Sequence, residues 1–289
     1  MISLIGVKYQ TAHSLFYLSK ILVPIVSSFI SNYQERSPHM KAILYIGHGT
    51  RSKQGAAEAN LFTESVIKKV DHPIQQMSFL ELTEPTIEKG FDRCVQEGAT
   101  DITIVPLFLL AAVHIKQDIP DTLAPLIEKY PNISVTMADP FGVQGRILDA
   151  IAELVTIEAE PISLNDSILI VGRGSSDPSI QESFHLIAQG ISQRLGIKEV
   201  HVCYLAAASP TFKEGLDSIC EKAAGRIIVI PYLLFAGLLL SEVKREVQKK
   251  KKQGYSILLT DALGSHQVIQ DIVIEKANGK ENASAAASH

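Results

Sequence analysis

The sequence predicts an α/β protein of two similar lobes, each with a parallel sheet flanked by helices and related to the other by internal duplication. Short apolar segments alternate with helical patterns, which is typical of parallel sheets covered by helices. Several of these segments are continuously apolar rather than alternating, as expected for strands buried on both faces. The whole pattern then occurs a second time, which predicts two lobes of the same architecture.

The first repeat predicts four strands and four helices in alternation. Strands are expected near 42–46, 75–80, 102–106 and 133–138, and helices near 53–69, 85–97, 115–129 and 143–155. The third strand ends at Pro106, which has no backbone N–H to extend the ladder, and a loop then leads to His114. Because open α/β sheets bind ligands beyond the carboxyl ends of their strands, we expect His114 at such a site.

The duplication shows as a shift of 125 residues, the difference between positions 47 and 172. Residues that match under this shift are Gly47, Gly49, Pro85, Thr86, Gly90 and Pro106 with Gly172, Gly174, Pro210, Thr211, Gly215 and Pro231. We interpret shared residues as scaffold, and polar residues found in one repeat alone as candidates for function. The predicted domains are an extension at 1–40, lobes at 41–157 and 158–275, and a disordered tail at 276–289.

The extension does not match the repeats, and Met40 is a candidate natural start. Its apolar segment from Leu15 to Ile30 is interrupted by Lys20 and several serines, and it is short for a membrane span. A membrane-associated helix is the alternative interpretation of this segment.

Composition indicates a folded protein with a sizeable core. Of 289 residues, 46% are hydrophobic and 20% charged, and the net charge of −4 gives no bulk attraction to nucleic acid. The three cysteines form no CxxC pair, so we expect reduced, buried thiols in a cytoplasmic protein. Neither a P-loop nor a GxGxxG motif is present, which disfavours an enzyme that uses a nucleotide.

Three polar residues of the first repeat are lost in the second. His48, Glu81 and His114 correspond to Arg173, Ala206 and Leu239. Each follows a predicted strand, so neighbouring strands bring them to one edge of the sheet. Two imidazoles and a carboxylate suit a borderline divalent metal such as Fe(II), Co(II), Ni(II) or Zn(II), and they also accept protons. A lone histidine at a strand end is more often an ordinary polar residue, but the joint loss favours a functional set.

These segments resemble the sirohydrochlorin chelatases, the class II chelatases that insert Fe(II) or Co(II) into sirohydrochlorin. The motifs are IGHGTR at 46–51, FLELTEPT at 79–86, VPLFLLAAVH at 105–114 and GRGSSDP at 172–178. The resemblance covers about residues 41–275, and the two-repeat length is similar to the long ferrochelatase type associated with siroheme synthesis. It implies chelatase-like lobes of flavodoxin- or Rossmann-like architecture. It also implies that His48, Glu81 and His114 handle the metal and carry the catalysis.

The resemblance further implies a cytoplasmic lyase that needs no prosthetic group. Its partners are sirohydrochlorin and a divalent metal substrate, Fe(II) or Co(II), and we expect a monomer with no nucleic-acid or membrane partner. Neutral His48 and His114 can ligate the ion and accept the two pyrrole protons, while Glu81 completes the site or relays protons outward. Because protonated imidazoles do neither, activity is expected to fall in acid.

Basic residues near strand ends are candidates for holding the carboxylates of the substrate, since an acidic protein has to bind them locally. The candidates are Arg51, Lys116, Arg146 and Arg173. We interpret Arg173, which replaces the histidine of the first repeat, as a carboxylate clamp, with an ordinary surface arginine as the alternative. Two other functions stay open: a cobaltochelatase of cobalamin synthesis, and a metal- or tetrapyrrole-binding protein without turnover.

Overall fold

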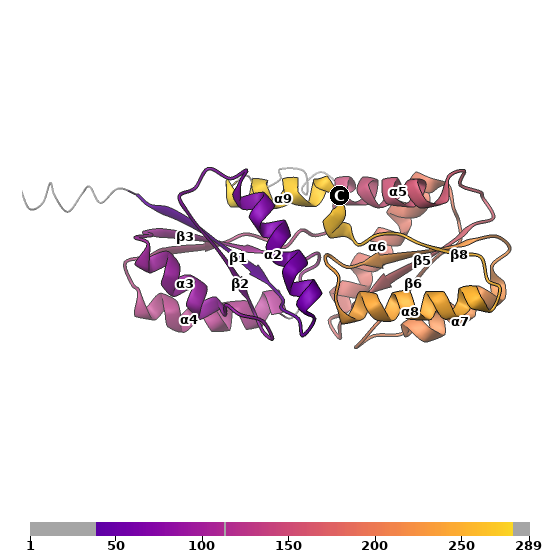
Figure 1. Cartoon of the computed structure of the whole chain (residues 1–289), viewed down its shortest axis with the longest axis horizontal. Helices are drawn as coiled ribbons and strands as arrows, with labels where there is room; N and C mark the ends of the chain where they lie inside the picture. The colour runs from indigo at the N-terminus through magenta and orange to yellow at the C-terminus, as the bar shows by residue number, and fades with distance from the viewer. Residues whose placement is uncertain (1–38, 113, 280–289) are drawn as a thin grey trace, which may run out of the picture. The chain divides into compact units, whose positions relative to one another are not determined.

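The computed structural model describes residues 39–112 and 114–279, without the side chains of His114 and Ile115 (Figure 1). The predicted extension up to residue 38, with its apolar segment, and the predicted tail from residue 280 lie outside these residues. The described residues from Lys41 onward form one compact unit that contains two four-stranded sheets. Within the described part of the chain, no helix is long and apolar enough to cross a bilayer.

The first sheet has the strand order β2-β1-β3-β4, and all of its strands are parallel. Its elements are β1 (Lys41–Gly47), α2 (Lys53–Ile67), β2 (Ile74–Phe79), α3 (Ile87–Gln96), β3 (Asp101–Pro106), the π-helical turn η1 (His114–Asp118), α4 (Ile119–Lys129) and β4 (Ser134–Met137). These match the predicted segments to within a few residues. From Ala42 to Gly47 every residue of β1 is buried, as its continuous apolar sequence predicts.

The second sheet has the equivalent order β6-β5-β7-β8, again all parallel. Its part of the chain comprises α5 (Gly145–Ala159), β5 (Ser167–Gly172), α6 (Pro178–Leu195), β6 (Val200–Tyr204), α7 (Phe212–Lys222), β7 (Ile227–Tyr232), α8 (Leu238–Lys252), β8 (Ile257–Leu259), the 3₁₀ turn η2 (Leu263–Ser265) and α9 (Gln267–Ala277). The central strand β5 is buried throughout, like β1. The predicted α/β fold with two similar lobes is confirmed.

Several helices begin at a residue whose side chain caps the first turn. Ser52 caps α2, Thr86 caps α3, and Thr211 forms a capping box with Glu214 at the start of α7. Thr86 and Thr211 occupy equivalent positions in the two repeats, so this device belongs to the shared scaffold. It stabilises the first turns of α3 and α7.

The last helix of each repeat packs on the sheet of the other. Helix α5 follows β4 in the chain but packs against α6, β7 and β8, whereas α9 follows β8 and packs against α2 and β3 (Figure 1). The two exchanged helices also meet, where the guanidinium of Arg146 on α5 donates to both carboxylate oxygens of Glu275 on α9 at 2.9 and 2.7 Å. Packing therefore groups α5 with the second sheet and α9 with the first, whereas the predicted lobes at 41–157 and 158–275 follow the chain.

This exchange makes the core continuous. One cluster of buried apolar side chains includes Ile43 and Tyr45 of β1 together with Ile168 and Ile170 of β5. Because each sheet is completed by a helix from the other repeat, the two lobes are expected to unfold together. The carboxyl ends of the central strands, at Gly47 and Gly172, are thereby held in one framework.

Candidate active site

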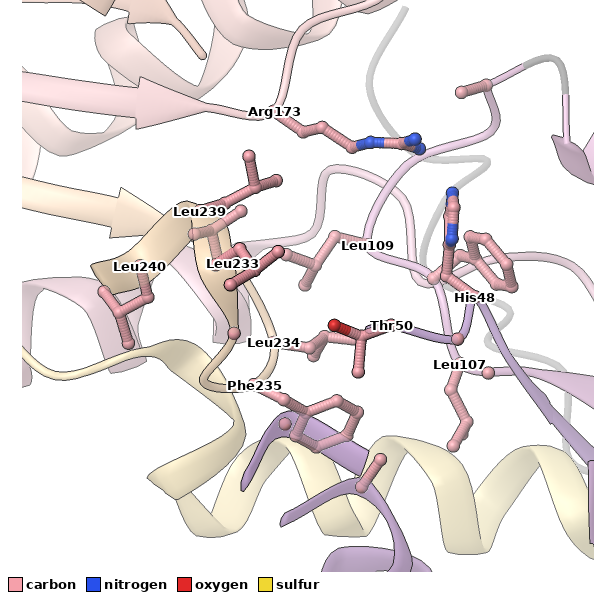
Figure 2. A pocket seen from close by; sticks show the side chains of 18 of the residues that line it. His48, Thr50, Leu107, Leu109, Arg173, Leu233, Leu234, Phe235, Leu239 and Leu240 are labelled. Atoms are coloured by element: carbon pink, nitrogen blue, oxygen red, sulfur yellow. The ribbon is translucent and has the colours of Figure 1, made fainter. Parts of the chain in front are cut away.

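A cavity of about 550 Å³ is lined by the loops that leave the carboxyl ends of both sheets. The first repeat contributes the loops after β1, β2 and β3, and the second repeat those after β5, β6 and β7. This volume is in the range of small-molecule sites, and the position at strand ends is the one that open α/β sheets use. Figure 2 shows the side chains that surround the cavity.

The polar groups of the cavity include His48, Glu81 and Arg173. The Nδ1 atom of His48 lies 3.4 Å from a carboxylate oxygen of Glu81, and about a quarter of the His48 side chain is exposed (24%). Arg173 extends from the opposite wall toward the side that carries His48 (Figure 2). Burial lowers the pKa of Arg173 from its usual value, and the negative charge of Glu81 acts in the opposite direction. An imidazole, a carboxylate and a guanidinium thus meet at one cavity.

Backbone contacts place His48 and Glu81 side by side. The N–H of Glu81 donates to the carbonyl of His48 at 3.1 Å, so the loops after β1 and β2 touch through their main chains. Between them, Gly49 has a φ of 93°, and a Cβ at this position would overlap the carbonyl oxygen of Glu81. Only glycine allows this approach, which explains the GHG sequence at the strand end.

The second repeat keeps this scaffold but not its chemistry. The N–H of Ala206 donates to the carbonyl of Arg173 at 2.8 Å, and Gly174 has a φ of 88° with the Ala206 carbonyl against it. The backbone arrangement is therefore the same in both repeats, while the side chains differ. As expected from the duplication, Ala206 and Leu239 line the cavity together with Arg173.

Most of the cavity wall is apolar. The lining side chains include Leu107, Phe108, Leu109, Leu110, Leu233, Leu234, Phe235, Leu238, Leu239 and Leu240. They follow β3 and β7, and Figure 2 labels several of them around the hollow. The sequence interpretation named Leu239 as the counterpart of His114 and assigned no site role to the others. The sequence does contain an indication of this wall. The apolar residues continue past Pro106 and Pro231 into loops, where burial in a strand no longer explains them.

His114 is the first residue of η1, at the end of the loop that follows β3. A π-helical turn is uncommon and often marks a functional position. The side chain of His114 lies outside the described residues, so its place in the trio stays a prediction. Among the side chains that the structure does describe, no group of three or more His, Cys, Asp and Glu residues is arranged to hold a metal ion.

The four predicted substrate-binding residues fall into two classes. Arg51 and Arg173 line the cavity, and both side chains are exposed. Lys116 is not among the lining residues; its Nζ lies 2.6 Å from the Oδ2 of Asp177, the N-cap of α6, and holds the pKa of that carboxyl down at about 2. Arg146 is held by Glu275 between the exchanged helices, so its placement does not support a substrate contact.

Comparison with known proteins matches the sequence and the fold to one family. The CbiX family model matches residues 42–158 and again 167–279. A sirohydrochlorin ferrochelatase of Priestia megaterium is 43% identical over 235 residues, which are 81% of this chain and 88% of that protein. A sirohydrochlorin cobaltochelatase of the same organism is 28% identical over 245 residues, 83% of this chain and 79% of that protein.

A solved structure, SirB from Bacillus subtilis with Fe3+, superposes with a TM-score of 0.73 at 34% identity, covering 86% of this chain and 98% of that one. The match therefore extends over both repeats. The resemblance predicted from the motifs is confirmed: the chain belongs to the CbiX family and carries the family's repeat twice.

Proposed function

We propose that this chain is a sirohydrochlorin ferrochelatase, a lyase that inserts Fe(II) into sirohydrochlorin with release of two protons. The observation that carries the proposal is the asymmetric cavity, in which one wall bears His48 beside Glu81 and the other bears Arg173 among apolar side chains. The ferrochelatase relative at 43% identity supports iron over other metals. No prosthetic group enters the proposed reaction, because the metal is itself a substrate.

The apolar wall is suited to hold the flat macrocycle and to exclude water from its centre. Leucine and phenylalanine side chains from the loops after β3 and β7 supply this surface. The many carboxylates of the substrate then need cationic partners at the edge of the ring. We assign this role to Arg51 and Arg173, since a guanidinium pairs with a carboxylate through two parallel hydrogen bonds.

His48 is proposed to contact the metal and to accept a pyrrole proton. If its Nδ1 carries the hydrogen directed at Glu81, then Nε2 carries the lone pair that binds a cation or a proton. The Glu81 carboxylate then fixes the ring orientation and stabilises the positive charge that His48 gains. His114 is proposed as the second imidazole, which supplies a further metal ligand or accepts the second proton.

Cobalt insertion is the second candidate function. Imidazole and carboxylate ligands accept Fe(II) and Co(II) alike, and the chain is also similar to a cobaltochelatase, at 28% identity. The test is anaerobic incubation with sirohydrochlorin and either metal, followed by absorbance. Faster insertion of Fe(II) supports the ferrochelatase, faster insertion of Co(II) the cobaltochelatase. A spectral change on substrate binding with no insertion of either metal would indicate a binding protein and refute both.

We also propose that the chain acts as a monomer in the cytoplasm. Both walls of the cavity come from one chain, because the two repeats provide the two sets of strand-end loops. A single chain therefore needs no partner subunit to complete the site. Light scattering during gel filtration should give the mass of one chain; the mass of a dimer would contradict the assignment.

A further inference from the structure

Thr83 lies two residues after Glu81 and forms two hydrogen bonds with the main chain of Thr50, two residues after His48. Its Oγ1 accepts from the Thr50 N–H at 2.9 Å and donates to the Thr50 carbonyl at 2.9 Å. Thr83 is partly buried and is not among the residues that line the cavity. One hydroxyl group thus satisfies both backbone groups of a residue in the opposite loop.

The hydrogen bonds continue from Thr50 to helix α2. The Oγ1 of Thr50 accepts from the Ser52 N–H at 3.1 Å, and Ser52 caps α2 by accepting from the Gly55 N–H at 3.2 Å. The loop that carries His48 is therefore fixed at its far end by the helix and in its middle by Thr83. These contacts limit how far His48 can move relative to Glu81.

The second repeat provides an internal control for this contact. The loop turn is shared, since the Oγ of Ser175 accepts from the Asp177 N–H at 3.1 Å as Thr50 does from Ser52. The position that corresponds to Thr83 is Ala208, which has no side-chain oxygen.

The backbone of the second loop adopts the same conformation without the hydroxyl. Leu82 and Ala207, the preceding residues in the two repeats, both have positive φ angles of 62° and 55°. The scaffold therefore does not require a threonine at this position. The hydroxyl occurs in the repeat that carries the histidine and the carboxylate, and it is missing where both are lost.

We infer that Thr83 is a positioning residue for the metal-insertion reaction: it holds the His48 loop in register with Glu81 without touching the substrate. The inference rests on the function proposed above. The Nδ1 of His48 lies 3.4 Å from Glu81, at the outer limit of a hydrogen bond, so a small loop displacement separates the pair. Misplacement of a reacting group by about 1 Å reduces a rate by up to about 100-fold.

The test compares Thr83→Val, which removes the hydroxyl at constant shape, with Thr83→Ser, which keeps it. Thr83→Val should lower kcat for Fe(II) insertion by about 10- to 100-fold while KM for sirohydrochlorin changes by less than about twofold. Thr83→Ser should recover kcat to within about threefold of the parent chain. Amide hydrogen exchange at residues 48–51 should accelerate in the valine variant and not in the serine variant.

A matched control is Thr86→Val, because Thr86 lies three residues away and its hydroxyl accepts from the Lys89 N–H at the start of α3. That variant should lose stability without loss of kcat, which separates positioning from folding. The inference is overturned if Thr83→Val keeps the parent kcat, if Thr83→Ser is equally impaired, or if Thr86→Val lowers kcat as much. Failure of the parent chain to insert any metal would instead refute the proposed function, and the exchange measurement would still test the contact.

Discussion

Replacement of Arg173 tests the proposed division of labour between the two walls. Arg173 lines the cavity with an exposed side chain, and the negative charge of Glu81 compensates its charge only in part. A substrate carboxylate would complete that compensation through a bidentate, charge-assisted contact of about 1.5–3 kcal/mol. Since each 1.4 kcal/mol corresponds to a factor of ten, Arg173→Leu should raise KM for sirohydrochlorin by roughly 10- to 150-fold.

The lysine variant refines this test. Arg173→Lys keeps the charge but loses the planar fork, so we expect a rise in KM of about tenfold with kcat changed by less than about threefold. The assay is steady-state Fe(II) insertion under anaerobic conditions over a range of sirohydrochlorin concentrations. Arg245→Lys is the control, because Arg245 is exposed on α8 beside Glu246 and is not among the residues that line the cavity. Unchanged KM and kcat in Arg173→Lys and Arg173→Leu would show that Arg173 binds no substrate carboxylate.

Three further predictions concern residues other than Arg173. His114→Ala should abolish or greatly slow insertion of Fe(II) and Co(II). The circular dichroism spectrum should stay unchanged, because the other repeat folds with leucine at this position. Unchanged rates with both metals would refute the catalytic assignment. Arg146→Met should lower the free energy of unfolding by about 1 kcal/mol, because the ion pair with Glu275 is lost, and should leave kcat/KM unaltered. A loss of activity at unchanged stability would instead indicate that Arg146 contacts the substrate. Lys116→Met should lower the melting temperature at pH 7, because the lowered pKa of Asp177 adds stability only while that carboxylate is ionised. The difference should shrink as the pH falls from about 4 through 2, and a difference that does not depend on pH would contradict this.

The fold was predictable because its signals are local. The central strands β1 and β5 contain only hydrophobic residues and glycine after their first residue, and the starts of α2 and α3 carry their own caps at Ser52 and Thr86. The exchange of α5 and α9 was not predicted. Duplication gives both sheets equivalent faces, so the apolar stripe of a helix shows that it packs on a sheet but not on which one.

The proximity of His48 and Glu81 was predictable from the difference between the two repeats. Comparison of the repeats singled out His48 and Glu81, and the structure places their side chains 3.4 Å apart. The ion pair of Arg146 was not predicted, because its partner Glu275 comes from the exchanged helix α9. For Lys116, the acceptor Asp177 is 61 positions away in the chain and belongs to the other repeat. Long-range ion pairs of this kind leave no periodic pattern in a sequence.

The central claim is that the first repeat carries the chemistry and the second repeat holds the substrate. The most direct test is anaerobic Fe(II) insertion into sirohydrochlorin by His48→Ala, measured together with the affinity for the metal-free substrate. We expect kcat to fall by about 100-fold or more, as for loss of a general base, with the affinity for sirohydrochlorin within about threefold of the parent. Insertion at the parent rate would contradict the claim, because His48 would then be dispensable in the repeat assigned to catalysis.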